Sequence, residues 1–344
     1  MSDSELGVAV VGCGDRGRKH AAAWARRPDA RVLAVADEDS ACAHALATAF
    51  EAVGYTDWRA AIAHPGIDVV SVCVPTCLHA PVTVAAAGLG RHVLCEKPMA
   101  LSLAEADRMI AACDAAGVQL VVSYQNRDAP RFQQLAISYR AGHFGTPVML
   151  RFVDCREVRP KVLMHSLSGN GGPIHDMAGH FIDLMRWITG NEAEAVYASG
   201  HVFGRGKQRL NPIQDLGIDC AELQIRFGGG HVCSIFIDWG LPEGTAGHGE
   251  VIAIGPDAWA RVEGDGLVLH GRDARQTHLP GDAPDPIDSV ARIGDLVQAI
   301  RSGHPPVVDG RSGRETLRVT LAALESVRTG RLIDLRRGAS ATPG

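Results

Sequence analysis

The sequence lacks any apolar run close to the ~20 residues that a membrane-spanning helix requires. Its longest apolar stretches, Val69–Pro75 and Val118–Val122, have the length of single strands. The first residues, Met1–Glu5, have neither the basic start nor the apolar core of a secretory signal. These absences predict a cytoplasmic protein with no membrane partner.

Long runs of lysine or arginine are also missing. The chain has 34 Lys and Arg against 39 Asp and Glu, a net charge of −5. Nucleic-acid binding usually requires a basic stripe on the protein surface. The charge pattern therefore predicts no nucleic-acid partner.

Cysteines are present but do not suggest a disulfide framework. There are nine, an odd number, and they lie mainly inside apolar segments, as at Cys73, Cys95 and Cys233. Such residues behave as small buried hydrophobic side chains in a reducing compartment. This reading agrees with a cytoplasmic location.

The length and the pattern of apolar residues predict two domains. At 344 residues, 46% of them hydrophobic, the chain is too long for one ordinary core. From Leu6 to about Val122, continuous apolar strands alternate with amphipathic helices, which indicates a doubly wound parallel sheet. The predicted strands are Leu6–Val11, Arg31–Ala36, Val69–Val74, His92–Leu94 and Val118–Val122, and the predicted helices are Arg16–Arg27, Ala41–Ala52, Ala80–Gly88 and Leu103–Ala116.

After Ser123 the pattern changes to strands in succession, which indicates an α+β domain with a large, mainly antiparallel sheet. The predicted strands are Val148–Val153, Ala195–Phe203, Cys220–Phe227, His231–Trp239, Val251–Ile254 and Leu267–Leu269. The predicted helices are Phe132–Arg140, Asp176–Thr189, Asp288–Arg301 and Gly313–Arg328. We therefore expect a nucleotide-binding α/β domain over residues 1–123 and a substrate and oligomerisation domain over residues 124–344.

A glycine pattern marks the expected nucleotide site. Gly12, Gly14 and Gly17 follow the strand Val8–Val11 directly and open a helix, with Asp15 and Arg16 in the same turn. Gly12 permits a tight turn, Gly14 lets the backbone approach phosphate, and Gly17 allows close packing of helix on strand. The helix N-terminus then offers unpaired N–H groups to a pyrophosphate.

Asp37 is expected to select NAD. It lies 20 residues beyond Gly17, at the end of the next predicted strand. A carboxylate there accepts hydrogen bonds from both ribose hydroxyls of NAD and repels the extra phosphate of NADP. Arg16 or Arg18 could soften this preference, and a structural role for Asp37 as a helix cap is the alternative.

Lys97 and the segment around His180 carry the candidate chemistry. Lys97 follows a short apolar strand in Glu96-Lys97-Pro98, at the sheet edge where ligands of such folds bind. Asp176, His180 and Asp183 are spaced i, i+4 and i+7, one stripe of a helix. A buried, purely structural histidine is one alternative. A metal site is another, but no cysteine lies nearby to complete a ligand set, so we expect no metal.

The chain resembles the family of glucose–fructose oxidoreductase and inositol dehydrogenase, the Gfo/Idh/MocA oxidoreductases. The resemblance spans essentially the whole chain, and its most specific part is Glu-Lys-Pro combined with Gly-Gly-x-x-x-Asp-x-x-x-His. The matching segments are Gly12–Gly17, Val74-Pro75-Thr76 with His79, Glu96-Lys97-Pro98, Asn126-Arg127, Gly171–Asp183 and Gly310–Gly330.

The resemblance implies an N-terminal Rossmann domain, a C-terminal domain whose open sheet carries homodimer or homotetramer contacts, and a cis peptide before Pro98. It implies a catalytic set of Lys97, Asp176 and His180. The implied cofactor-binding residues are Gly12, Gly14, Asp15, Arg16, Gly17, Asp37, Pro75, Thr76, His79, Glu96, Lys97 and Asn126. The implied substrate-binding residues are Lys97, Arg156, His165, Asp176 and His180.

The expected function is NAD-dependent oxidation of a secondary alcohol on a cyclic polyol or pyranose, with His180 as general base. Alternatives are a dehydrogenase or reductase of a sugar acid, an amino-sugar derivative or a dihydrodiol, and a non-catalytic dinucleotide sensor. The sequence departs from the family at Cys77, where asparagine is frequent, and over Arg156–Ser168, which matches no family motif. These departures concern the substrate, which the loop Arg156–Gly172 and Trp239 would select.

Overall fold

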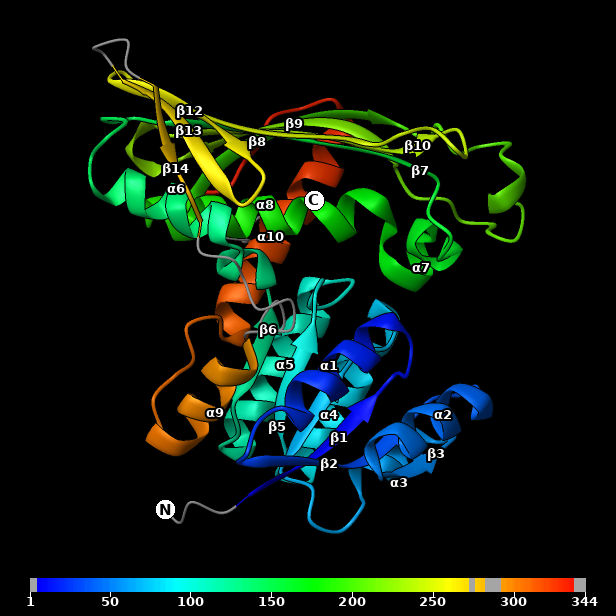
Figure 1. The fold of residues 1–344 in the computed structure, drawn as a ribbon. Coiled ribbons are helices and arrows are strands. Elements are labelled where there is room, and N and C mark those ends of the chain that lie inside the picture. The colour runs from blue at the N-terminus through cyan, green and yellow to red at the C-terminus, as the bar shows by residue number, and fades with distance from the viewer. Residues whose placement is uncertain (1–4, 272–275, 282–291, 337–344) are drawn as a thin grey trace, which may run out of the picture. The chain divides into compact units, whose positions relative to one another are not determined.

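The computed structural model describes residues 5–271, 276–281 and 292–336 (Figure 1). Backbone contacts divide the chain into two units. Unit 1 contains Met1–Gln125 and Asp285–Leu317, and unit 2 contains Asn126–Pro284 and Arg318–Gly344. The predicted second domain contains everything after residue 123, whereas the chain returns to unit 1 over Asp285–Leu317.

Unit 1 is built on a six-stranded parallel sheet with the order β3-β2-β1-β4-β5-β6. Its strands are β1 (Leu6–Val11), β2 (Ala30–Ala36), β3 (Val53–Tyr55), β4 (Val69–Val72), β5 (His92–Glu96) and β6 (Leu120–Ser123). The predicted doubly wound parallel sheet is confirmed, and β3 is an additional edge strand. Sequence patterns missed β3 because it has three residues with Gly54 at its centre.

Helices connect the strands of unit 1. They are α1 (Asp15–Ala25), α2 (Ser40–Phe50), α3 (Trp58–Ile62), α4 (His79–Gly88) and α5 (Leu103–Ala116), with a 3-10 turn η1 (Thr76–Leu78) before α4. The bounds of α5 match the prediction because its ends carry local signals. The Ser102 side chain accepts a hydrogen bond from the Glu105 amide at the start, and Gly117 adopts φ 66° at the end.

Helix α9 (Arg292–Ser302) explains the return of the chain to unit 1. Its Ile293, Leu296 and Val297 are buried in the same apolar cluster as Val8 and Val121 of the parallel sheet. The helix predicted over Asp288–Arg301 corresponds to α9, and residues 288–291 lie outside the described residues. The last helix, α10 (Gly310–Thr329), begins in unit 1 and ends in unit 2.

Unit 2 is built on a nine-stranded mixed sheet with the order β14-β13-β12-β11-β7-β10-β9-β8-β15. Its strands are β7 (Met149–Glu157), β8 (Ala193–His201), β9 (Cys220–Phe227), β10 (Val232–Leu241), β11 (His248–Ile254), β12 (Ala258–Glu263), β13 (Gly266–Gly271), β14 (Gln276–Leu279) and β15 (Ile333–Asp334). The predicted mainly antiparallel sheet is confirmed, although β7 and β10 pair in parallel at its centre.

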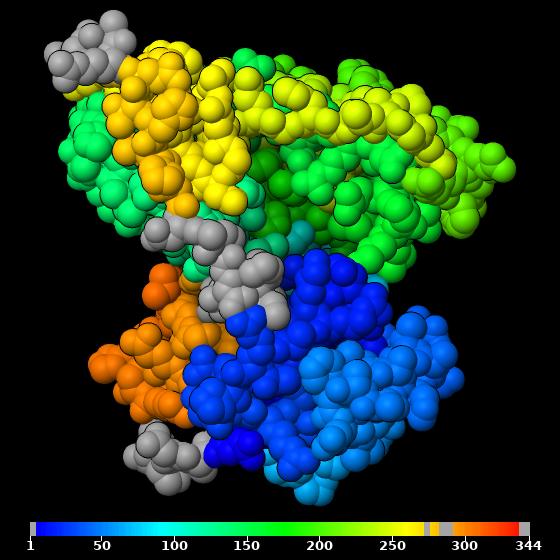
Figure 2. All heavy atoms as spheres, viewed as in Figure 1, coloured from blue at the N-terminus to red at the C-terminus, as the bar shows by residue number. Residues whose placement is uncertain are grey.

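One face of this sheet is covered by α6 (Pro130–Arg140), α8 (Gly172–Thr189) and the end of α10 (Figure 1). Phe181 of α8 stacks on Phe152 of β7 with ring centroids 4.5 Å apart, and Val319 of α10 joins the same core. Shorter turns are η2 (Gln125–Asp128), η3 (Val162–His165), α7 (Leu167–Asn170), η4 (Gln208–Leu210) and η5 (Gly228–Gly230). Figure 2 shows the space-filling surface of β11 to β14 in yellow and orange.

In the described part of the chain, no helix combines the length and the apolar character needed to cross a membrane. All nine cysteines are described, and all are free thiols.

Candidate functional site

The turn between β1 and α1 has the geometry of a phosphate-binding loop. Gly12 adopts φ +95°, and a Cβ there would stand 2.5 Å from the carbonyl oxygen of Cys73. A Cβ on Gly17 would stand 1.7 Å from the carbonyl oxygen of Gly12. Both positions therefore require glycine. By contrast, a Cβ on Gly14 would meet nothing within 4 Å.

Gly14 is also the N-cap residue of α1, and no side chain caps this helix. The dipole of this helix makes its N-terminal end attractive to an anion. Open space beside an uncapped helix N-terminus is what a bound pyrophosphate requires, so this turn fits a dinucleotide.

Asp37 lies directly against the same turn, one residue after β2. Its Oδ2 accepts a hydrogen bond from the Cys13 amide at 2.7 Å, and its Oδ1 accepts one from the Asp39 amide at 3.0 Å. The carboxylate is thus held at the end of β2, where the sequence analysis expected a ribose ligand. Asp39, rather than Asp37, caps helix α2.

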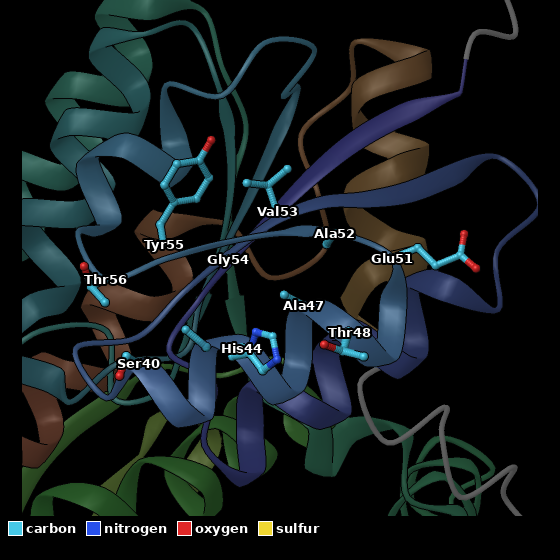
Figure 3. A pocket seen from close by; sticks show the side chains of 11 residues that line it. Ser40, His44, Ala47, Thr48, Glu51, Ala52, Val53, Gly54, Tyr55 and Thr56 are labelled. Carbon is cyan, nitrogen blue, oxygen red and sulfur yellow. The ribbon is translucent and has the colours of Figure 1, made fainter.

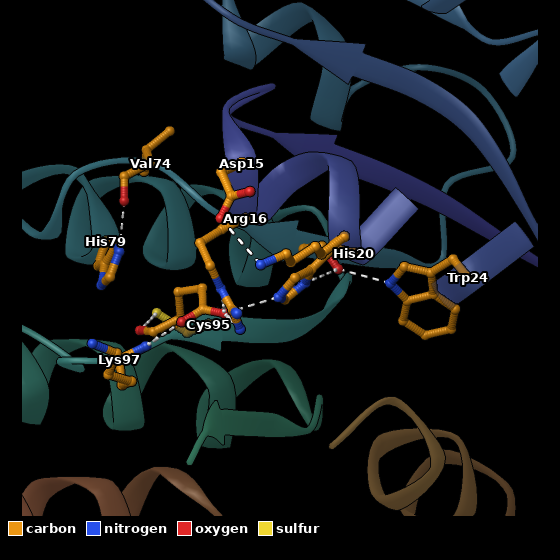
Figure 4. A network of polar contacts seen from close by, with 11 residues as sticks. Asp15, Arg16, His20, Trp24, Val74, His79, Cys95 and Lys97 are labelled. Atoms are coloured by element: carbon orange, nitrogen blue, oxygen red, sulfur yellow. Dashed lines mark hydrogen bonds and ion pairs between the residues drawn. The ribbon is translucent and has the colours of Figure 1, made fainter. Parts of the chain in front are cut away.

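Glu96 forms the centre of a buried network at the end of β5 (Figure 4). Its Oε1 accepts hydrogen bonds from Arg16 Nε at 2.8 Å and from His20 Nε2 at 3.0 Å. Its Oε2 accepts one from the Lys97 amide at 3.2 Å. The network continues from His20 through the Ser71 hydroxyl to the Trp24 indole, which donates to Ser71 Oγ at 2.8 Å.

This network fixes the charge of Glu96. Burial by itself would raise the pKa of the carboxyl, but the charge of Arg16 and the hydrogen bond from His20 hold the pKa well below its usual range. Through its hydrogen bond with the Lys97 amide, the Glu96 carboxylate orients the backbone of Lys97. Arg16 was expected to contact the cofactor, and in the structure its guanidinium is engaged by Glu96.

His79 connects the loops that follow β4 and β5. Its Nε2 is 2.9 Å from the carbonyl oxygen of Val74, and its Nδ1 is 2.8 Å from that of Pro98 (Figure 4). The ring is buried, which lowers the pKa of His79. The predicted cofactor residues Pro75 and Thr76 directly follow Val74. Because the His79 ring is buried and contacts both loops, it holds the loops together rather than lying at their surface. The Lys97–Pro98 peptide is cis, as the resemblance implies.

In unit 2, Asp176 and His180 lie on α8 one turn apart, and both are almost buried, with 5% exposure. The helix begins at Gly172, one turn before the predicted start, because Pro173 suits a first turn. The Asn170 side-chain amide donates to Asp176 Oδ1 at 2.9 Å. Asn170 was not predicted. Its partner Asp176 is six residues further along the chain. The predicted start of α8 is four residues later than the observed one, so the contact across the helix start was not expected.

The third member of the stripe, Asp183, has a different role. Arg127 Nε and Nη2 donate to its two carboxylate oxygens at 2.7 and 2.6 Å, and both side chains are buried. Asp183 is therefore part of an ion pair that joins η2 to α8. The predicted residue Asn126 lies in the same turn η2, next to Arg127.

The predicted substrate residues Arg156 and His165 lie in unit 2: Arg156 is at the end of β7, and His165 follows it in η3. Arg156 Nε donates to Asp154 Oδ1 at 2.9 Å, and its guanidinium lies 5.4 Å from the Trp239 ring centre. His165 has no exposed surface, and its Nε2 accepts a hydrogen bond from the Arg159 amide at 3.3 Å. His165 thus holds the loop backbone, whereas Arg159, which the sequence analysis did not select, lies over Trp239.

Other features of the surface do not enter the site. An open pocket between α2 and β3 is lined by Ser40, His44, Tyr55 and neighbouring residues, none of them predicted site residues (Figure 3). Among the residues that the structure describes, no group of three or more His, Cys, Asp or Glu could hold a metal ion.

Comparison with known proteins identifies the family. Residues 6–124 match the oxidoreductase family with an NAD-binding Rossmann fold, and residues 132–265 match the GFO/IDH/MocA C-terminal domain. The myo-inositol 2-dehydrogenase of Thermotoga maritima is 28% identical over 95% of this chain and 98% of its own. An uncharacterized oxidoreductase of Bacillus subtilis, YrbE, is 30% identical over 67% of this chain and 66% of its own.

Among solved structures, the aldose-aldose oxidoreductase of Caulobacter crescentus superposes with a TM-score of 0.82. It is 25% identical, and the match covers 96% of this chain and 100% of that chain. Together with both family domains, these matches show that the chain belongs to the Gfo/Idh/MocA oxidoreductases. It is an oxidoreductase with an NAD-binding Rossmann domain.

Proposed function

We propose that this oxidoreductase transfers a hydride between a nicotinamide cofactor and a secondary alcohol or ketone of a cyclic polyol or pyranose sugar. The observation that carries the proposal is the pair Asp176 and His180 on one stripe of α8, with Asp176 oriented by Asn170. One relative of named activity that matches nearly the whole chain is a myo-inositol 2-dehydrogenase.

NAD is the proposed cofactor. Gly12, Gly14 and Gly17 would hold its pyrophosphate against the first turn of α1, and Asp37 would bind its adenosine ribose. The fixed negative charge of Asp37 opposes the 2′-phosphate of NADP. When bound, NAD supplies the hydride acceptor for alcohol oxidation.

Three residues would transfer the hydroxyl proton and stabilise the charge on the substrate oxygen: His180, Lys97 and Asp176. His180 would accept the hydroxyl proton as general base, the role that histidine fills most often in proton transfer. The ammonium of Lys97 would stabilise the negative charge that develops on the substrate oxygen. Asp176 would hydrogen-bond the substrate or orient the imidazole of His180.

A panel of inositols, aldoses and sugar acids, assayed by NADH absorbance, tests the function. We expect turnover with at least one ring polyol, and a higher kcat/KM with NAD than with NADP because of Asp37. A matched set with NADP checks the cofactor preference. Absence of turnover on the whole panel, in either direction and with either cofactor, would refute the proposal.

We also propose that the open face of the unit 2 sheet forms a homodimer or homotetramer contact. Strand register places exposed Met149, Ile254 and Trp259 directly opposite one another on β7, β11 and β12. Trp259 stacks on His270 of β13 at 4.0 Å between ring centroids. An apolar row of this kind on an otherwise open sheet is typical of a subunit interface.

Sedimentation equilibrium measures this directly. The wild-type protein is expected at a mass of two or four chains, and Trp259→Asp together with Ile254→Asp is expected to shift it toward one chain. Val53→Asp, an equally exposed apolar residue on the edge of the unit 1 sheet, is the control and should leave the mass unchanged. A wild-type mass of one chain would contradict the proposal.

A further inference from the structure

The ends of β7 and β10 hold Trp239 in a fixed position. The two strands pair in parallel, with Ile237 opposite Asp154, so both strands end at the same edge of the sheet. Trp239 Nε1 donates to Asp154 Oδ2 at 2.7 Å, and the side chain is 1% exposed. The indole therefore forms a rigid platform for whatever stacks on it.

Two guanidinium groups lie on this platform, and they differ in their partners. Arg156 and Arg159 lie 5.4 and 5.6 Å from the Trp239 ring centre. Arg156 is neutralised by Asp154, which accepts hydrogen bonds at 2.9 and 2.8 Å. Among the residues described, the guanidinium of Arg159 makes no hydrogen bond or ion pair, and its Nε is buried without a partner.

An unsatisfied guanidinium N–H that is buried is unusual, because such groups are stable only when an acceptor replaces water. Stacking on an indole compensates part of the charge from the ring face. It leaves the N–H groups in the plane of the guanidinium, where hydrogen-bond acceptors bind. The missing partner of Arg159 is therefore an acceptor.

The surroundings of Arg159 indicate that this acceptor is an anion. The Arg159 amide donates to His165 Nε2, so the proton of the neutral ring is on Nδ1, which is buried and has no partner in the described residues. Burial lowers the pKa of His165 to about 4, with the positive charges of Arg159 and Lys207 as further causes. Among the described residues, no carboxylate is a cause of the shift in the pKa of His165.

The chain segment from Arg159 to Asn170 leads to α8, the helix that carries the proposed catalytic residues of unit 2. The chain runs from Arg159 through η3 and α7 to the start of α8, and α7 lies below the end of β7 in Figure 1. The Gly217 amide donates to the His165 carbonyl at 2.8 Å, and the Ser166 hydroxyl donates to Asp215 at 2.8 Å. Asn170 at the end of this ordered segment binds Asp176.

We propose that Arg159 is a specificity-determining residue that binds a carboxylate of the substrate, and that the preferred substrate is a sugar acid or another carboxylated ring polyol. The proposal rests on the proposed function, since it names the substrate class of that reaction. A carboxylate matches one guanidinium in geometry and charge, because two parallel N–H groups donate to its two oxygens.

Steady-state kinetics with two matched sugars test the proposal. D-glucuronate and D-glucose differ in one carboxylate, and the wild-type enzyme is expected to have the higher kcat/KM with D-glucuronate. Arg159→Gln should raise KM for D-glucuronate roughly 10- to 100-fold, the range expected for losing a hydrogen bond to a charged group. KM for D-glucose should change less than about twofold, the ordinary variation at a site without a lost contact.

Arg205→Gln is the control, because it removes the same charge from an exposed position of unit 2. It should leave both KM values unchanged, whereas an equal effect of Arg205→Gln would show a general charge effect and overturn the proposal. A higher wild-type kcat/KM with D-glucose, or an Arg159→Gln variant that binds D-glucuronate normally, would also overturn it.

Calorimetric titration separates this proposal from the proposed function. D-glucuronate binding to the wild-type protein with NADH present, lost in Arg159→Gln, supports the carboxylate site even if no sugar is turned over. Turnover of neutral polyols with no D-glucuronate binding leaves the function intact and rejects the site. Inorganic phosphate, titrated in parallel, is expected to bind more weakly than D-glucuronate, and tighter binding would reject a carboxylate as the ligand.

Discussion

Replacement of His180 by asparagine is expected to lower kcat by about 10²- to 10⁴-fold, the usual contribution of a general base. His180 lies one turn after Asp176 on α8 and is 5% exposed, so water has little access to replace the imidazole as a proton acceptor. Asparagine keeps a polar planar group but cannot accept the proton. Stopped-flow measurement of NADH formation, at saturating NAD and polyol, gives the rate directly.

Lys97→Met should lower kcat by a similar factor for a different reason: the positive charge that stabilises the developing alkoxide is missing. Both variants should still bind NADH, measured by fluorescence, because Gly12, Gly14 and Asp37 are unchanged. His143→Asn, an exposed histidine of unit 2, is the matched control and should keep wild-type turnover. If His180→Asn or Lys97→Met stays within tenfold of the wild type, its assignment is wrong.

Asp183→Ala is expected to destabilise the protein by about 3–5 kcal/mol, the cost of leaving a buried charge without its partner. The Arg127 and Asp183 side chains are 7% and 1% exposed, so water cannot solvate the remaining guanidinium. Urea unfolding followed by circular dichroism measures the change in the free energy of unfolding.

Two controls make the unfolding measurement specific for the buried ion pair: a variant of an exposed ion pair and a double variant of the buried pair. Asp114→Ala removes the partner of Arg311 in an exposed pair, and its cost should be no more than about 1 kcal/mol. Arg127→Met combined with Asp183→Leu should recover part of the loss, because it removes both buried charges. A loss below about 1 kcal/mol for Asp183→Ala would mean that Arg127 finds another partner or water.

The sequence alone predicted the features that depend on residues close together in the chain. The turn at Gly12, Gly14 and Gly17 was found because conformational freedom and close approach are needed at fixed spacings. The start and end of α5 were found because Ser102 and Gly117 are local stop signals. The spacing of Asp176 and His180 likewise follows from the helical period.

The partners of charged residues were not predictable in the same way. Arg16 and Glu96 are 80 residues apart, and Arg127 and Asp183 are 56 apart. Sequence spacing placed Arg16 in the phosphate turn and Asp183 in the catalytic stripe. In the structure each is engaged in an ion pair, because a buried charge is stable only beside its counter-charge.

The sequence by itself therefore determined the Rossmann sheet, the glycine turn and the stripe of α8, since hydrophobic periods and glycine positions are local properties. Tertiary structure alone decided that Asp285–Leu317 belongs to unit 1, that Glu96 orients the Lys97 backbone, and that Arg159 lies over Trp239 with no counter-ion among the described residues. Those outcomes depend on which side chains compete for the same buried space and charge, and packing brings together residues that are distant in the chain.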